Sequence, residues 1–128
     1  MARIQGDLKV RSFRFAQRVL AIVDHLPNNT KGWVICRPLV RAGTGIGSNV
    51  READNARTDV EFAHKCSIAR KEAGETNDWL DLCISTGPLR GADASYMLRE
   101  SDALTRILSA IVLGTQRFLS NPEEQPDE

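Results

Sequence analysis

Apolar residues recur at intervals of three and four along most of the chain, the spacing that places them on one face of an α-helix. In the first such stretch the apolar face is formed by Leu8, Phe15, Val19, Ile22 and Leu26. The run LPNNTKG that follows contains proline, asparagine and glycine, which end helices. The pattern therefore predicts a first helix over residues 8–26.

Two further helices are predicted in the second half of the chain. Thr58 and Glu61 have the spacing of a capping box. Behind them, apolar and small residues step by four and three at Phe62, Cys66, Ala69, Ala73, Thr76, Leu80 and Cys83. Gly87 and Pro88 end this helix, which we predict over residues 59–85. A last helix is predicted over residues 95–120, with an apolar face formed by Met97, Leu104, Leu108, Ile111 and Phe118. The acidic tail at 121–128 has nothing apolar, so we expect it to be disordered.

Residues 41–52, RAGTGIGSNVRE, first suggest a loop that cradles phosphate. The dinucleotide fingerprint would need glycine where the chain has Ser48, and no Gly-Lys-Ser/Thr tripeptide is present. A helix over residues 36–55 fits better, with Pro38 in its first turn and one face formed by Leu39, Gly43, Ile46, Val50 and Ala53. Gly43 and Gly47 are four residues apart, which favours close packing of a neighbouring helix.

Four helices joined by short connections predict an all-α fold, a single domain over residues 1–120. Short links favour antiparallel neighbours, hence an up-down-up-down four-helix bundle.

Charge is balanced overall but divided along the chain. Residues 1–50 contain eight basic and two acidic residues, a net +6, and residues 51–128 contain nine and fifteen, a net −6. A neutral chain does not resemble a dedicated nucleic-acid binder. The division leaves two alternatives: two solvated faces, or charge pairing between helices or between copies.

The three cysteines Cys36, Cys66 and Cys83 have no C-x-x-C spacing, which favours reduced thiols in a cytoplasmic protein over a disulfide framework or a zinc site. The most apolar run, ILSAIVL, is too short to span a bilayer. We expect a cytoplasmic protein without a membrane partner.

Residues 40–82 combine two blocks of polar and small residues at a fixed separation. Their members are Arg41, Gly43, Thr44, Asn49, Glu52, Ala53, Phe62, Lys65, Glu72, Ala73, Glu75, Trp79 and Leu80. These blocks resemble the four-helix bundle protein family first noticed in intervening sequences of large-subunit ribosomal RNA genes. Gly45 stands where that family more often has serine, and Pro38 where glutamine is usual.

The resemblance implies a bundle that assembles into a closed ring, a homopentamer, with no established enzymatic activity. A related branch resembles the accessory protein of diversity-generating retroelements, a strongly basic reverse-transcriptase partner, from which this neutral chain differs. Within the family pattern, Asn49 and Glu52 suit either a hydrogen bond between helices that fixes their register or a binding surface on the ring.

The sequence contains few residue patterns that are typical of an enzyme active site. Glu61 and His64 have the Glu-x-x-His spacing of di-iron bundles, but such sites need two pairs, and the only other histidine, His25, follows Ile22 by three residues. The spacing of Glu72, Glu75 and Asp78 on one helix favours a solvated helix face over a functional carboxylate cluster. We predict no catalytic residue, no metal, no cofactor and no small-molecule substrate.

Two functional hypotheses remain. The first is a non-enzymatic oligomeric scaffold. The alternative is a nucleic-acid-associated accessory protein that binds RNA or a reverse transcriptase through a basic band of Arg11, Arg14, Arg18, Arg37, Arg41 and Arg51.

The last helix supports self-association. Its large apolar residues spread over about 180°, whereas one core-facing stripe needs little more than about 100°. The surplus predicts an oligomer interface that includes Ile107, Ile111 and Val112.

Overall fold

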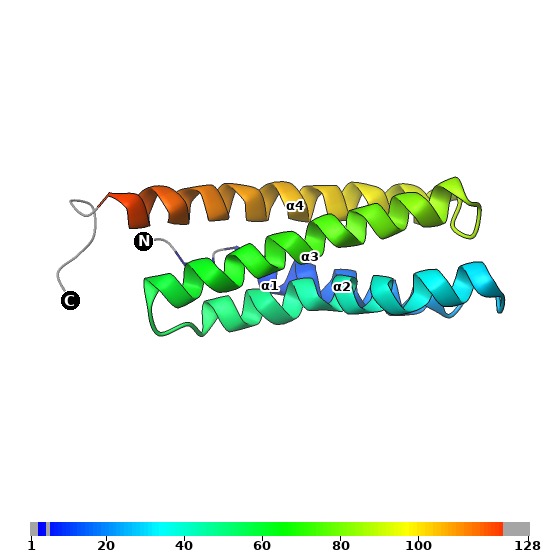
Figure 1. The fold of residues 1–128 in the computed structure, drawn as a ribbon, viewed down its shortest axis with the longest axis horizontal. Coiled ribbons are helices and arrows are strands. Elements are labelled where there is room, and N and C mark those ends of the chain that lie inside the picture. Colours follow the sequence, from blue (N-terminus) through cyan, green and yellow to red (C-terminus); the bar gives the residue numbers. More distant parts are fainter. Residues whose placement is uncertain (1–2, 5, 122–128) are drawn as a thin grey trace.

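The computed structural model describes residues 3–4 and 6–121, and all regular secondary structure in these residues is helical. The four helices are α1 (Leu8–Val23), α2 (Thr30–Asp54), α3 (Asp59–Ser85) and α4 (Gly91–Ser120). They lie along one long axis, and each runs antiparallel to the preceding helix, so the predicted up-down bundle is confirmed (Figure 1). Within the described residues no helix is long and apolar enough to cross a membrane. The predicted tail lies outside the described residues except for Asn121.

Three predicted helix boundaries were wrong, all at the same end of the bundle. Helix α1 ends three residues earlier than predicted, α2 begins six residues earlier and α4 begins four residues earlier. The start of α2 is set by Asn29, whose side chain accepts a hydrogen bond from the N–H of Gly32. Pro38 therefore lies inside α2 and not in its first turn. It leaves the carbonyl of Val34 without the usual helical donor.

The core is formed by the predicted apolar faces. The whole α3 seam from Phe62 to Cys83 is buried, and Thr58 caps the helix by accepting a hydrogen bond from the N–H of Glu61. The largest fully buried side chains come from all four helices, and they include Phe15, Leu39, Ile46, Phe62, Leu80, Met97, Leu104 and Leu108.

Helices α1 and α2 approach closely at the two glycines that the sequence singled out. A Cβ atom on Gly43 would lie 2.7 Å from Cγ2 of Val19, and one on Gly47 would lie 3.4 Å from the backbone of Ser12. The packing role predicted for Gly43 and Gly47 is confirmed.

The fourth side of the bundle is closed differently from the other three. Helix α3 packs extensively on α2 and α4, whereas α1 packs mainly on α2 and has few contacts with α4. Long polar side chains bridge α1 and α4. Arg11 donates hydrogen bonds to both carboxylate oxygens of Glu100. Arg18 lies 3.6 Å from Asp93 and stacks on Tyr96.

Helix α4 presents a smaller apolar surface than its sequence predicted. Val112 is only 4% exposed and belongs to a core cluster with Phe62, so its assignment to an exposed interface was wrong. Ile107 and Ile111 are partly buried against the core. Val112 is buried because it packs with Ala53 of α2 and with Phe62 and Cys66 of α3, and Ile4 packs against the same cluster.

Candidate functional site

The polar residues that suggested metal chemistry have structural roles or lie at the surface. The carboxylate of Glu61 accepts a hydrogen bond from the backbone N–H of Arg57, beside the cap of α3, and His64 is exposed on the surface of α3. Among residues 3–4 and 6–121, no three His, Cys, Asp or Glu side chains are grouped so that they could hold a metal ion.

The family-pattern residues on α2 mostly serve α2 itself. Thr44 donates its hydroxyl hydrogen to the carbonyl of Val40, and Asn49 donates to the carbonyl of Gly45 at 2.8 Å. Of the two alternatives predicted for Asn49, the hydrogen bond to another helix is not formed, since its amide donates within α2. Glu52 does connect helices, because its carboxylate lies 2.7 Å from the ammonium of Lys65 on α3.

Glu72 explains the glycine at position 45. A Cβ on Gly45 would lie 3.2 Å from the carboxyl carbon of Glu72, so a larger residue would press on that side chain. Burial, and then the nearby charge of Glu75, raise the pKa of Glu72, while Arg41 opposes the rise. Of the aromatic residues in the pattern, Phe62 is buried and Trp79 is partly buried against the core.

The six predicted nucleic-acid-binding arginines do not form one free basic band. Arg11 and Arg18 are held against α4, as described above, and Arg51 stacks on the ring of Phe13 at 4.7 Å. The other three, Arg14, Arg37 and Arg41, make no ion pair in the part of the chain that the structure describes.

Most of the exposed large apolar side chains lie on α1 and the start of α2. Eight such side chains are exposed among the residues that the structure describes, and five of them are Val10, Phe13, Leu20, Trp33 and Val34. Trp33 is 63% exposed, and its ring is held by a 2.8 Å hydrogen bond from Nε1 to the side-chain oxygen of Asn28. Sequence reasoning missed Trp33 because it placed the start of α2 after this residue.

Three of these apolar residues lie with Val40 and the arginines of α2 along a surface that we call the basic strip. It consists of Val10, Phe13, Trp33, Arg37, Val40, Arg41 and Arg51. One depression of about 710 Å³ is lined by its Trp33 end, and another of about 340 Å³ by its Phe13 end. Trp33 and Arg51 are eighteen residues apart, which is five helical turns, so both depressions lie on the same side of α2, about 27 Å apart.

A second surface, the acidic face, lies on the outer side of α3. It consists of Glu75, Asp78, Asp81 and Leu82, and Leu82 is 44% exposed. Residues 72–89 contain no lysine or arginine, just as residues 25–51 contain no acid. No ion pair joins the acidic face to the basic strip within the described chain.

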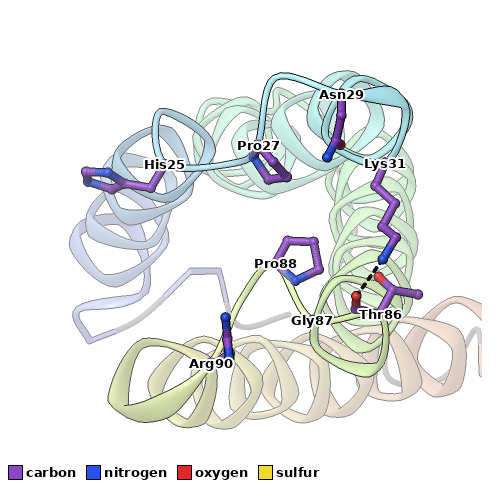
Figure 2. Close-up of a pocket in the computed structure, with 8 residues that line it drawn as sticks. All are labelled: His25, Pro27, Asn29, Lys31, Thr86, Gly87, Pro88 and Arg90. Atoms are coloured by element: carbon purple, nitrogen blue, oxygen red, sulfur yellow. Dashed lines mark hydrogen bonds between the residues drawn. The ribbon is translucent and has the colours of Figure 1, made fainter.

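A pocket of about 490 Å³ lies at one end of the bundle, between the loop from α1 to α2 and the loop from α3 to α4. We call it the end pocket (Figure 2). Asn29 and Lys31 come from the start of α2, Thr86 from the end of α3 and Arg90 from the residue before α4. From the sequence these loops were identified only as helix ends.

Comparison with known proteins agrees with this fold. Residues 7–110 match the 23S rRNA-intervening sequence protein family. A crystal structure of a protein of unknown function from the S23 ribosomal protein family of Bacteroides thetaiotaomicron superposes with a TM-score of 0.76 and 34% identity. That similarity covers 82% of this chain and 97% of the other. No curated protein sequence matches at a significant level. Because the family match spans most of the chain and the fold agrees, the chain belongs to the 23S rRNA-intervening sequence protein family.

Proposed function

We propose that the protein is a non-enzymatic, self-assembling scaffold of the cytoplasm, in which the basic strip of one copy binds the acidic face of the next. The observation that carries this proposal is the exposed Trp33 beside arginines that have no ion-pair partner in the described residues. Tryptophan and arginine are the residues most enriched where binding energy concentrates in protein interfaces. The three free cysteines agree with a reducing compartment.

Apolar burial supplies a driving force for this contact. Covering a large apolar side chain stabilises an assembly by about 1.5–3 kcal/mol. Trp33 and Val40 on the strip and Leu82 on the acidic face are available for it. Contiguous exposed apolar patches rimmed by polar groups typically mark interaction sites.

Charge supplies orientation. Arg37 and Arg41 lie beside Trp33, whereas Asp78 and Asp81 lie beside Leu82. The apolar centre of the basic strip is therefore bordered by positive charges, and that of the acidic face by negative charges. Such complementarity steers encounter and excludes the pairing of two identical surfaces.

A contact between two different surfaces of the same chain is head-to-tail, and it either closes into a ring or continues as a filament. We propose a closed ring, in which both surfaces of every copy are covered. Five copies is the ring size that the family resemblance implies.

The experiment uses one variant for each surface. Trp33→Glu disables the basic strip and leaves the acidic face intact, and Leu82→Arg does the reverse. Each variant alone should elute as a 14.2 kDa monomer. Mixed together they should form a dimer that cannot grow further, because only one competent contact remains.

Leu113→Glu is the matched control, because Leu113 is 47% exposed on α4 and lies outside both surfaces. It should leave the assembly unchanged in light scattering. A wild-type monomer at micromolar concentration would sink the proposal, as would a mixture that restores the full assembly.

A second candidate, nucleic-acid binding, is favoured by one observation. Arg14, Arg37 and Arg41 have no ion-pair partner in the described residues, and the last two border an exposed tryptophan on which a base could stack. Three phosphate contacts would give a modest salt dependence. Binding that survives physiological salt and is lost in an Arg14/Arg37/Arg41→Ala variant would support this candidate over self-assembly as the role of these arginines.

A further inference from the structure

We propose that the end pocket binds a phosphate group carried by a small molecule or by a nucleic-acid end. The proposal is independent of self-assembly, because it depends on the loops at the bundle end and not on either outer surface. It rests on a lining that presents hydrogen-bond donors and cations and no carboxylate.

Asn29 supplies a donor whose direction is fixed. Its side-chain oxygen accepts a hydrogen bond from the N–H of Gly32 at 3.1 Å, as the cap of α2. The amide NH₂ must then lie on the other side of the group, where it donates no hydrogen bond within the described residues. Figure 2 shows this side chain directed from the start of α2 toward the space between the two loops. The capping hydrogen bond therefore orients the two N–H groups of the Asn29 amide toward the pocket.

Lys31 is also held in place. Its ammonium donates a hydrogen bond to the carbonyl of Thr86 at 2.9 Å, reaching across from α2 to the end of α3 (Figure 2). An ammonium has three donors, so two remain for a ligand. The contact fixes the lysine without neutralising it, because its partner is a neutral carbonyl and not a carboxylate.

Arg90 completes the cationic lining from the opposite loop. It is exposed, precedes α4 in an extended conformation and makes no ion pair within the described chain. Its planar fork of donors suits two oxygens of one phosphate group. His25 lies at the rim, and its ring is turned outward in Figure 2, so the site does not depend on it.

The expected anion binding depends on the side chains that line the pocket and not on the helix dipoles. Two helices begin and two end at this end of the bundle, so their partial charges largely offset one another. Pro27 and Pro88 face the pocket from the two loops and restrict the loop backbones. A lining that has a net positive charge and donors from Asn29, Lys31 and Arg90 favours an anion with several acceptor oxygens, such as a phosphate group.

The pocket has a volume of about 490 Å³ and is open to solvent. It leaves room for the group that carries the phosphate. Two sources are therefore compared: a nucleoside diphosphate, and the 5′-phosphate of a short oligonucleotide. The unphosphorylated nucleoside and oligonucleotide are the corresponding controls.

The experiment is isothermal titration calorimetry on the full chain with inorganic phosphate, pyrophosphate and these ligands. Pyrophosphate should bind saturably, and removing phosphate from either larger ligand should abolish its binding. The tighter of the two phosphorylated ligands identifies the source. A Lys31→Ala/Arg90→Ala variant should bind pyrophosphate at least about tenfold more weakly, because two charge-assisted contacts are lost.

Asn29→Asp gives a sharper test. Aspartate caps a helix as well as asparagine does, so stability and assembly size should be unchanged, while a carboxylate replaces the donor and should abolish pyrophosphate binding. The matched control is Lys71→Ala/Arg99→Ala, which removes two cations from α3 and α4, away from the pocket. No saturable binding to the wild type would overturn the proposal. So would undiminished binding by Asn29→Asp, or an equal loss in the control.

Discussion

At the scale of single residues, the glycines of α2 are explained by their neighbours. A Cβ on Gly32 would lie 1.8 Å from the carbonyl oxygen of Pro27, so no other residue fits where the chain turns into α2. Gly43 and Gly47 let α1 approach, and Gly45 leaves room for Glu72. By contrast, a Cβ on Gly74 in α3 would have open space within 4 Å.

This contrast gives a paired prediction. Gly43→Ala should destabilise the protein by about 1–3 kcal/mol, because the new methyl overlaps the fully buried Val19. Gly74→Ala should stabilise it by about 0.5–1 kcal/mol, because alanine costs less backbone entropy within a helix. Both free energies of unfolding come from denaturant titration at one protein concentration, since assembly adds to apparent stability. Equal effects of the two substitutions would contradict the packing role of Gly43.

Glu72 gives a pH-dependent prediction. Its pKa is raised in the folded state, so between the ordinary value of 4.5 and the raised value the folded protein binds more protons than the unfolded chain. Stability contributed by protonated Glu72 is therefore lost as the pH rises through this interval. Glu72→Gln should raise the free energy of unfolding at neutral pH and have less effect below about pH 4.5. Denaturant titrations across this range test it, and a stability difference that does not vary with pH would contradict it.

At the scale of the helices, α1 differs from the others in how its two edges are held. Its apolar face packs on α2 and the core, while its edge toward α4 depends on arginines that reach acidic and aromatic partners. Hydrogen bonding to Glu100 raises the pKa of Arg11 further above its usual range, so the guanidinium stays charged. The seam between α1 and α4 is therefore electrostatic, whereas the other three seams are packed.

Removing the acid of that seam should loosen α1 selectively. In Glu100→Ala, Arg11 loses its hydrogen-bonded partner, and amide hydrogen exchange in residues 8–23 should accelerate while exchange in α3 stays unchanged. Asp102→Ala is the control, because Asp102 pairs with Arg106 within α4 itself. Uniform acceleration across all four helices would show that the pair stabilises the whole bundle instead.

At the scale of the whole molecule, opposite charges are gathered on different surfaces, and each surface carries an exposed apolar centre. The basic strip and the acidic face belong to neighbouring helices, yet no ion pair joins them within the described residues. Charges left unpaired in one chain remain available to another, which is the basis of the proposed head-to-tail contact.

Cysteine labelling provides a footprint of this contact. Cys36 lies partly exposed beside the strip, whereas Cys66 and Cys83 are buried, and burial raises the pKa of Cys66 to about 11. Iodoacetamide at neutral pH should label Cys36 quickly in the Trp33→Glu monomer and slowly in the wild-type assembly. The buried thiols should react only after denaturation, because they remain protonated and inaccessible. Equal Cys36 labelling rates in the two proteins, measured by mass spectrometry, would place the interface elsewhere.

Local sequence signals determined much of this protein. Periodicity identified four helices, because a helix that buries one face must repeat its apolar residues every three or four positions. Thr58 and Glu61 marked the start of α3, and the spacing of Gly43 and Gly47 indicated a close helix contact; both features are present in the fold. These predictions succeeded because each depends on residues within a few turns of one another.

Only the tertiary structure decided which surfaces are free. The sequence placed surplus apolar residues on α4, but Val112 joins the core, and Ile107 and Ile111 pack partly against it. The sequence also predicted that six arginines form one basic band. In the structure, three of them contact residues that are distant in sequence or on another helix. The end pocket unites two loops that are far apart in the sequence. Exposure and charge pairing depend on what packs alongside each residue, and helical periodicity along one segment does not contain that information.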